Sequence, residues 1–361
     1  MTPRRRRWPV ALGIALGLGS GAPDLGSLLS VPVRTVHAED EAAERVKAAL
    51  LDAAGNPTRL AKVLDESTAL VGPSAVFPDF GALADWYGTL PASVSGQPVV
   101  SVRRAWMYVS TKRGADAIPL LEPALVTSPR DALLRSYLGE ARRQAGDLAG
   151  AVTELARALD DGATDEQALP SVRKVVYEIK TAPNAPTTEG LPTYATAAAT
   201  FLARREMRDV RQSLIEWLLY DAVPSRTSAS RSALLRAEAI RHLAITLRPP
   251  VPLGERLRLA RRALEVVPML KALPEDVRAT LPTPFDLLAS AVRLGEAVDA
   301  EGNATGDGGH LLPEALAFLA EEALAKGRYV LADALARRRL AISDSPTARA
   351  VLRGLPPDVG D

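Results

Sequence analysis

The stretch GEARRQAGDLAGAVTELARAL, residues 139–159, decides the fold of this chain. It contains two runs of apolar residues on either side of Gly146-Asp147. In the second run the apolar residues recur at helical spacing on one face, at Ala151, Leu155, Ala158 and Leu159. Glycine reaches backbone conformations that other residues adopt only with strain. The stretch therefore predicts two helices that are joined by a tight turn.

The same pattern occurs 34 residues earlier in the chain. Small or apolar residues recur at this spacing, with Gly139, Ala151, Leu155, Ala158 and Leu159 preceded by Ala105, Ala117, Leu121, Ala124 and Leu125. Pro129 closes the earlier unit, because proline cannot continue a helix interior. One helix pair cannot bury its own apolar face, so the period predicts pairs that stack on one another.

A 34-residue period of helix pairs resembles the tetratricopeptide repeat. The matching units are 98–131 and 132–165, and a third unit near 313–346 carries Leu319-Ala320, Gly327, Tyr329 and Ala332 in the same order. The resemblance implies an all-α fold, namely a right-handed α-solenoid of antiparallel helix pairs that is partly degenerate. Ala and Leu, which are strong helix formers, dominate the apolar residues and favour the same fold class.

Some residues depart from the family pattern. In the first unit Gly114 lies two places after the turn position, and Pro119 and Pro123 fall in the second helix. We expect Pro119 to start that helix and Pro123 to kink it. Arg135 stands where the family often has Trp, and Arg339 where a small residue is expected.

The N-terminal region, 1–38, has the order of a secretory signal. Arg4 to Arg7 precede an apolar run, and Val36-His37-Ala38 offers small residues before a cleavage site. The alternative is an uncleaved anchor, but the apolar core Val10 to Leu18 is short of the roughly 20 residues that span a bilayer. We expect cleavage after Ala38, a periplasmic or secreted mature chain, and no transmembrane segment in it.

The rest of the chain is expected to be helical with interruptions. Residues 39–97 form an N-terminal helical segment with a Pro/Gly-rich stretch from Gly72 to Pro98, which is expected to be mostly loop with a short helix around Ala82–Trp86. Residues 166–310 hold degenerate helical repeats, with a linker at 181–192 and a loop at 299–310. Residues 311–361 form a C-terminal helix pair and a tail.

The charge and the inventory of reactive residues narrow the function. After residue 38, 39 basic residues face 42 acidic ones, so there is no electrostatic footprint for nucleic acid. The chain has no cysteine, His242 lies mid-helix beside apolar residues, and His310 has no second histidine nearby. No phosphate-binding loop or nucleophile elbow is present in the sequence. We predict no catalytic residue, no metal site and no cofactor.

The loop at 299–310 has one alternative interpretation. Asp299, Glu301, Asn303 and Asp307 carry oxygen ligands of the kind that calcium prefers. An EF-hand would place glycine at Ala304 and glutamate at His310, so a solvated loop is favoured.

The resemblance implies a protein-binding groove lined by the first helix of each unit. Carried over by position, the groove candidates are Trp106, Val109, Ser136, Glu140, Arg143 and Gln144. Trp106 fits core packing equally well. The leading hypothesis is therefore an exported, non-catalytic scaffold that binds a protein or peptide partner.

Two alternatives stay open. The first is a helical-repeat enzyme or small-molecule binder, with a pocket that joins Trp217, Tyr220, Asp221 and His242. The second is a structural envelope component that associates with itself.

Overall fold

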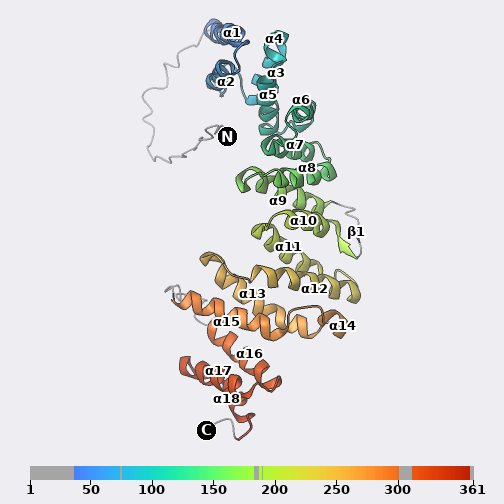
Figure 1. Ribbon diagram of the computed structural model, residues 1–361, viewed down its shortest axis with the longest axis vertical. Helices are drawn as coiled ribbons and strands as arrows, with labels where there is room; N and C mark the ends of the chain where they lie inside the picture. Colours follow the sequence, from blue (N-terminus) through green and yellow to red (C-terminus); the bar gives the residue numbers. More distant parts are fainter. Residues whose placement is uncertain (1–35, 74, 183–186, 189, 301–310, 358–361) are drawn as a thin grey trace, which may run out of the picture.

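The computed structural model describes residues 36–73, 75–182, 187–188, 190–300 and 311–357. Within these ranges the chain is all-helical, with 18 α-helices, one short 3-10 helix and one pair of two-residue strands. Figure 1 shows the helices following one another in chain order along the longest axis, from α1 at one end to α18 at the other. The expected all-α class is confirmed.

The bounds of the α-helices in chain order are α1 Val36–Ala53, α2 Pro57–Glu66, α3 Phe80–Thr89, α4 Ala92–Ser95, α5 Pro98–Ser110, α6 Gly114–Thr127, α7 Ala132–Gln144, α8 Leu148–Asp160, α9 Asp165–Thr181, α10 Thr193–Arg204, α11 Arg208–Asp221, α12 Ala229–Thr246, α13 Leu253–Lys271, α14 Glu275–Arg278, α15 Pro284–Ala300, α16 Leu311–Ala325, α17 Tyr329–Ile342 and α18 Pro346–Arg353. The 3-10 helix η1 is Ser67–Leu70, and strands β1 Thr187–Thr188 and β2 Leu191–Pro192 pair antiparallel.

Each helix packs mainly on its neighbours in chain order. The closest pairs are α5 with α6, α7 with α8, α11 with α12, α13 with α15, and α16 with α17. Contacts also join helices two places apart, such as α5 with α7 and α7 with α9. The apolar core accordingly forms two long clusters, one from Leu50 to Ala141 and one from Ala151 to Val351.

The units expected at 98–131 and 132–165 coincide with the pairs α5–α6 and α7–α8. Side-chain caps fix the starts of both helices in the second pair. The carboxylate of Asp131 accepts hydrogen bonds from the first turn of α7, and Asp147 accepts one from Gly150 N at 2.8 Å. Local sequence therefore determines these boundaries.

The turn of the first pair has no glycine in register, as the sequence indicated. Gly114 is not a turn residue, since it begins α6 and is buried. The residue in register with Gly146 is Lys112, and it adopts a left-handed backbone with φ 63°. The turn geometry is thus kept although the glycine is missing.

The two prolines of the first unit lie inside α6 rather than at its start. The helix begins at Gly114 and continues through Pro119 and Pro123 to Thr127. Both prolines are exposed, so water can bind the carbonyl groups that they leave without a donor. The expectation that Pro119 starts the helix is wrong.

The segment from Gly72 to Pro98 is more helical than expected, because it contains α3 and α4. Asp79 caps α3 by accepting a hydrogen bond from Ala82 N at 2.8 Å. The ring of Trp86 packs on Phe77, with centroids 5.4 Å apart. The prolines of this segment precede helices instead of breaking them.

The linker expected at 181–192 and the C-terminal pair are both visible in part. Helix α9 ends at Thr181, and β1 and β2 lie within the linker. The third unit corresponds to α16 and α17, with Gly327 between them at φ 68°.

Two expected features lie outside the described residues. They are most of the calcium alternative, in residues 301–310, and residues 1–35 of the expected signal. Among the described helices, none is both long and apolar enough to cross a membrane.

Candidate partner-binding surface

The helices α5, α7, α9, α11 and α13 form a connected series, which we call the odd-helix row. Polar side chains link its successive members. Between α5 and α7, Gln144 Nε2 donates a hydrogen bond to Val109 O at 2.9 Å. Between α7 and α9, Lys174 Nζ lies 3.3 Å from Glu140 Oε1. The two links join residues that are 35 and 34 positions apart, which is the period of the repeat.

The links continue into the part of the chain that shows no repeat register. Ion pairs join α9 to α11 and α11 to α13 through Arg173–Asp209, Lys180–Asp221 and Arg262–Glu216. The odd-helix row is therefore held together by charge pairs from α7 to α13.

Glu140 is the centre of the α7–α9 link. It is only 7% exposed, and its carboxylate accepts hydrogen bonds from Arg143, at 2.7 Å and 2.9 Å, and from Gln144 at 3.2 Å. Burial alone would raise the pKa of Glu140, but hydrogen bonds from Arg143 and Ser171 and the charge of Arg143 lower it to about 2. The side chain is therefore ionised at neutral pH.

Four of the predicted groove residues come together here, namely Val109, Glu140, Arg143 and Gln144. Arg143 also forms an ion pair with Glu178 of α9. These charged groups bind one another across helix interfaces. Their main role is thus to join neighbouring helices, and little of their charge is left for a partner.

The other two candidates lie differently. Ser136 is 3% exposed and its hydroxyl donates to Ala132 O of its own helix at 2.9 Å, so it is not available to a partner. Trp106 is partly buried and its ring packs edge-on against Phe80, with centroids 5.3 Å apart. The groove assignment of Ser136 is corrected by its burial, and Trp106 packs as its alternative interpretation expected.

An aromatic cluster between α9 and α11 was not predicted as a binding surface. Lys180 Nζ lies 5.0 Å, 5.9 Å and 5.7 Å from the ring centroids of Tyr194, Trp217 and Tyr220. Tyr177 adds a fourth ring, 6.2 Å from Trp217. Four aromatic rings from three helices therefore surround or flank one ammonium group.

Part of this cluster faces solvent. Tyr177 is 55% exposed and Tyr220 is 53% exposed. Exposed Tyr, Trp and Arg side chains are enriched where proteins bind one another. Tyr177 directly precedes Glu178, the partner of Arg143, so the cluster and the α7–α9 link use the same stretch of α9.

The pocket considered for a small-molecule site does not include its histidine. Trp217, Tyr220 and Asp221 come together around Lys180, whereas His242 has other partners. Arg211 Nη1 lies 3.1 Å from His242 Nδ1, and His242 Nε2 lies 3.1 Å from Glu238 Oε1. Arginine only donates, so Nδ1 accepts and Nε2–H donates to Glu238. His242 therefore links α11 to α12 through its contact with Arg211.

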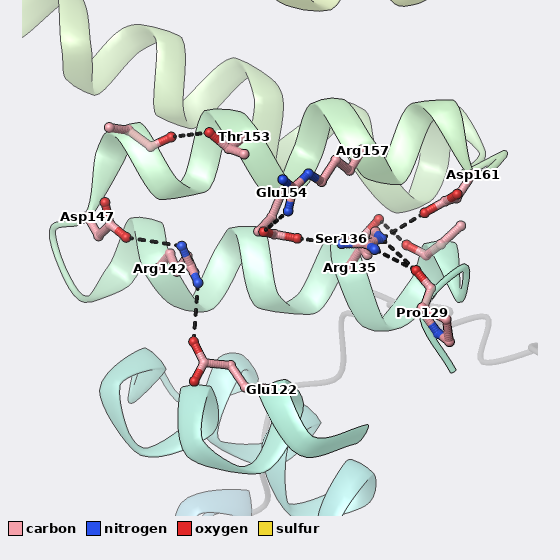
Figure 2. A network of polar contacts seen from close by, with 12 residues as sticks. Glu122, Pro129, Arg135, Ser136, Arg142, Asp147, Thr153, Glu154, Arg157 and Asp161 are labelled. Atoms are coloured by element: carbon pink, nitrogen blue, oxygen red, sulfur yellow. Dashed lines mark hydrogen bonds and ion pairs between the residues drawn. The ribbon is translucent and has the colours of Figure 1, made fainter. Parts of the chain in front are cut away.

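A second polar network braces the α7–α8 pair. Figure 2 shows Arg135 bound to Asp161, Glu154 and the carbonyl of Pro129. The distances to the two carboxylates are 2.7 Å and 2.8 Å. Arg135 occupies the position where the resembled family often has Trp, and here ion pairs replace aromatic packing.

The same network lines a surface depression of about 380 Å³. Its walls are formed by Pro129, Arg130, Arg135, Arg157, Asp160 and Asp161. Most of these charges are paired within the protein, including Arg157 with Glu154 and Asp160 with Arg204.

In the described part of the chain, no group of three or more His, Asp and Glu side chains is arranged to hold a metal ion. No protein-family model and no curated protein sequence matches this chain.

Proposed function

We propose that this chain is an exported, non-catalytic scaffold of the tetratricopeptide type, which binds a protein partner along the odd-helix row. The observation that carries the proposal is the aromatic cluster of Tyr177, Trp217 and Tyr220 on that row, in which Tyr177 and Tyr220 are half-exposed. Exposing large aromatic side chains to water is unfavourable, and covering them with a partner stabilises the complex.

The spacing of the contacts supports the repeat architecture. Val109 and Gln144, Glu140 and Lys174, and Arg143 and Glu178 are 34 or 35 positions apart and touch. Equivalent positions in successive repeats lie side by side in a solenoid of helix pairs. The proposal includes a right-handed solenoid that becomes irregular in its middle part, where the distance between linked positions grows to 46 for Glu216 and Arg262.

The non-catalytic part of the proposal rests on the sequence inventory. The chain has no cysteine for nucleophilic chemistry, and the described histidine, His242, binds Arg211 and Glu238. Export rests on the order of basic, apolar and small residues in 1–38.

Site-specific photocrosslinking tests the binding surface. A benzoylphenylalanine placed at Tyr177 is expected to form an adduct with a protein in the envelope fraction of cells that make the chain naturally. The matched control position is Val126 on α6, which is 83% exposed and lies outside the odd-helix row. The mass of the purified chain is expected to correspond to a start at Glu39.

Adducts of equal yield from both positions, or none from Tyr177, would contradict binding along the odd-helix row. A chain that retains residues 1–38 would contradict the cleaved signal.

A further inference from the structure

The cluster around Lys180 contains basic side chains as well as aromatic rings. We name as the aromatic–basic patch Tyr177, Lys180, Trp217, Tyr220, Arg226 and Arg231. These residues come from α9, α11, the turn after α11, and the first turn of α12. The patch thus combines residues near the ends of α9 and α11 with residues near the start of α12.

The aromatic part of the patch is held in place before any partner binds. Lys180 forms an ion pair with Asp221 at 3.3 Å, and the hydroxyl of Tyr194 donates to the same carboxylate at 2.7 Å. The Tyr194 ring packs edge-on against Trp217, with centroids 5.8 Å apart. Side chains that are already ordered lose little entropy when a ligand covers them.

One arginine lies against these rings, and a second lies in the first turn of α12. The guanidinium of Arg226 lies 3.9 Å from the ring centroid of Tyr220 and donates to its hydroxyl. Arg231 stands next to Ser232, whose hydroxyl donates to Ala222 O at 2.6 Å, and this contact places the start of α12 beside the end of α11. Both arginines are exposed.

The charges of the patch do not balance. No Asp or Glu in the described part of the chain lies within 4.0 Å of Arg226 or Arg231. Asp221 is shared by Lys180 and Tyr194, so of the three cations of the patch only Lys180 pairs with a described carboxylate. By contrast, the ion pairs of Arg143 and Arg173 satisfy the neighbouring part of the odd-helix row.

We infer that the aromatic–basic patch is the docking site for an acidic peptide segment of the partner, one with an apolar side chain flanked by carboxylates. The inference rests on the proposed function and specifies the chemistry of the partner. The exposed faces of Tyr177 and Tyr220 receive the apolar side chain. The planar guanidinium groups of Arg226 and Arg231 bind carboxylates with two parallel hydrogen bonds each.

Charge distinguishes this occupant from a nucleic acid strand, which also stacks on aromatic rings. A strand needs a track of cations along its backbone, whereas within the described residues of the patch only Arg226 and Arg231 have no acidic partner. The chain after residue 38 has 39 basic and 42 acidic residues, so no general excess of positive charge attracts a long polyanion.

Fluorescence anisotropy with a labelled probe tests the inference on the intact chain. The probe is a decapeptide in which Asp and Glu alternate with Leu and Phe, and the comparison probes are its Asn/Gln analogue and an oligothymidine of ten nucleotides. We expect the acidic peptide to bind, the neutral analogue to bind at least about tenfold more weakly, and the affinity to fall as salt is added.

Two double variants separate the patch from general charge effects. Arg226→Ser with Arg231→Ser is expected to weaken binding of the acidic peptide about tenfold or more. The matched control is Arg45→Ser with Arg353→Ser, which removes two exposed arginines of α1 and α18, outside the odd-helix row, and is expected to change the affinity less than about twofold. Tyr220→Ala is expected to weaken binding with both arginines in place.

Equal binding of the acidic and neutral peptides, tighter binding of the oligothymidine, or equal effects of the two double variants would overturn the inference. The Tyr177 crosslink distinguishes a failure of the docking chemistry from a failure of the scaffold function. If the Arg226/Arg231 variant keeps the protein adduct at full yield, the docking chemistry is wrong and the scaffold function stands. If the unmodified chain gives no adduct, the scaffold function itself fails.

Discussion

Lys112 and Gly146, which are 34 positions apart, adopt the same left-handed backbone conformation, with φ angles of 63° and 86°. In both turns the following residue donates to the carbonyl five positions earlier, from Arg113 N to Tyr108 O at 2.8 Å and from Asp147 N to Arg142 O at 2.9 Å. This hydrogen bond closes a Schellman motif. The turn thus recurs with the period of the repeat, independently of the residue that occupies it.

Lys112→Gly is expected to stabilise the protein. A residue with a Cβ is strained at positive φ, and glycine removes this strain while it adds some freedom to the unfolded chain. We expect the free energy of unfolding in urea to rise by about 0.5–1 kcal/mol. The opposite exchange at the equivalent position, Gly146→Lys, is expected to lower the free energy of unfolding by about 1 kcal/mol. A loss of stability in Lys112→Gly would contradict the shared geometry.

Gly114→Ala is expected to destabilise the contact between α6 and α7. A Cβ at Gly114 would lie 2.3 Å from Ala141 O and 2.7 Å from the Cβ of Gln144. Because a backbone atom stands in the way, we expect a loss of about 2–3 kcal/mol in the free energy of unfolding. Gly254→Ala is the control, since nothing lies within 4 Å of its added Cβ. Similar losses in both variants would show that the close approach is not the cause.

Local signals made much of the fold predictable. The helices α7 and α8 follow from apolar spacing and from the caps Asp131 and Asp147, all of which act within a few residues. The turn at Lys112 could not be predicted, because a lysine gives no sign of positive φ. The hydrogen bond from Arg113 N to Tyr108 O closes this turn, and no residue type in the segment indicates that bond.

The candidate site was predicted less well for the same reason. The register placed Glu140 and Arg143 on the correct helix, but their partners Lys174 and Glu178 lie in a segment to which no repeat was assigned. Whether a charge faces solvent or another helix depends on such distant partners. The aromatic–basic patch joins three segments without a common register, so only the folded chain reveals it.

Arg135→Ala is expected to destabilise the α7–α8 pair. It would leave the carboxylate of Glu154, which is 7% exposed, without its main partner and would also release Asp161. Removing one partner of a buried pair leaves an uncompensated charge, and we expect a loss of about 2–3 kcal/mol. Arg157 binds the same Glu154 from an exposed position, so Arg157→Ala is the control and is expected to cost less than about 1 kcal/mol. Thermal and urea unfolding measure both losses of stability. Equal losses in the two variants would show that the contacts of Arg135 do not stabilise the α7–α8 pair.

The ionised state of Glu140 makes stability depend on pH. Its pKa falls from the ordinary 4.5 to about 2 in the folded chain, so folding favours the charged form. The contribution of Glu140 is therefore complete above about pH 4.5 and is lost as the pH falls from there towards 2. Urea unfolding between pH 7 and pH 3 is expected to show that Glu140→Gln is less stable than the unmodified chain at neutral pH. This difference is expected to shrink with acid, whereas Glu314→Gln, at an exposed position, stays parallel to the unmodified chain. A difference that stays constant over this range would mean that the link between α7 and α9 does not depend on the charge of Glu140.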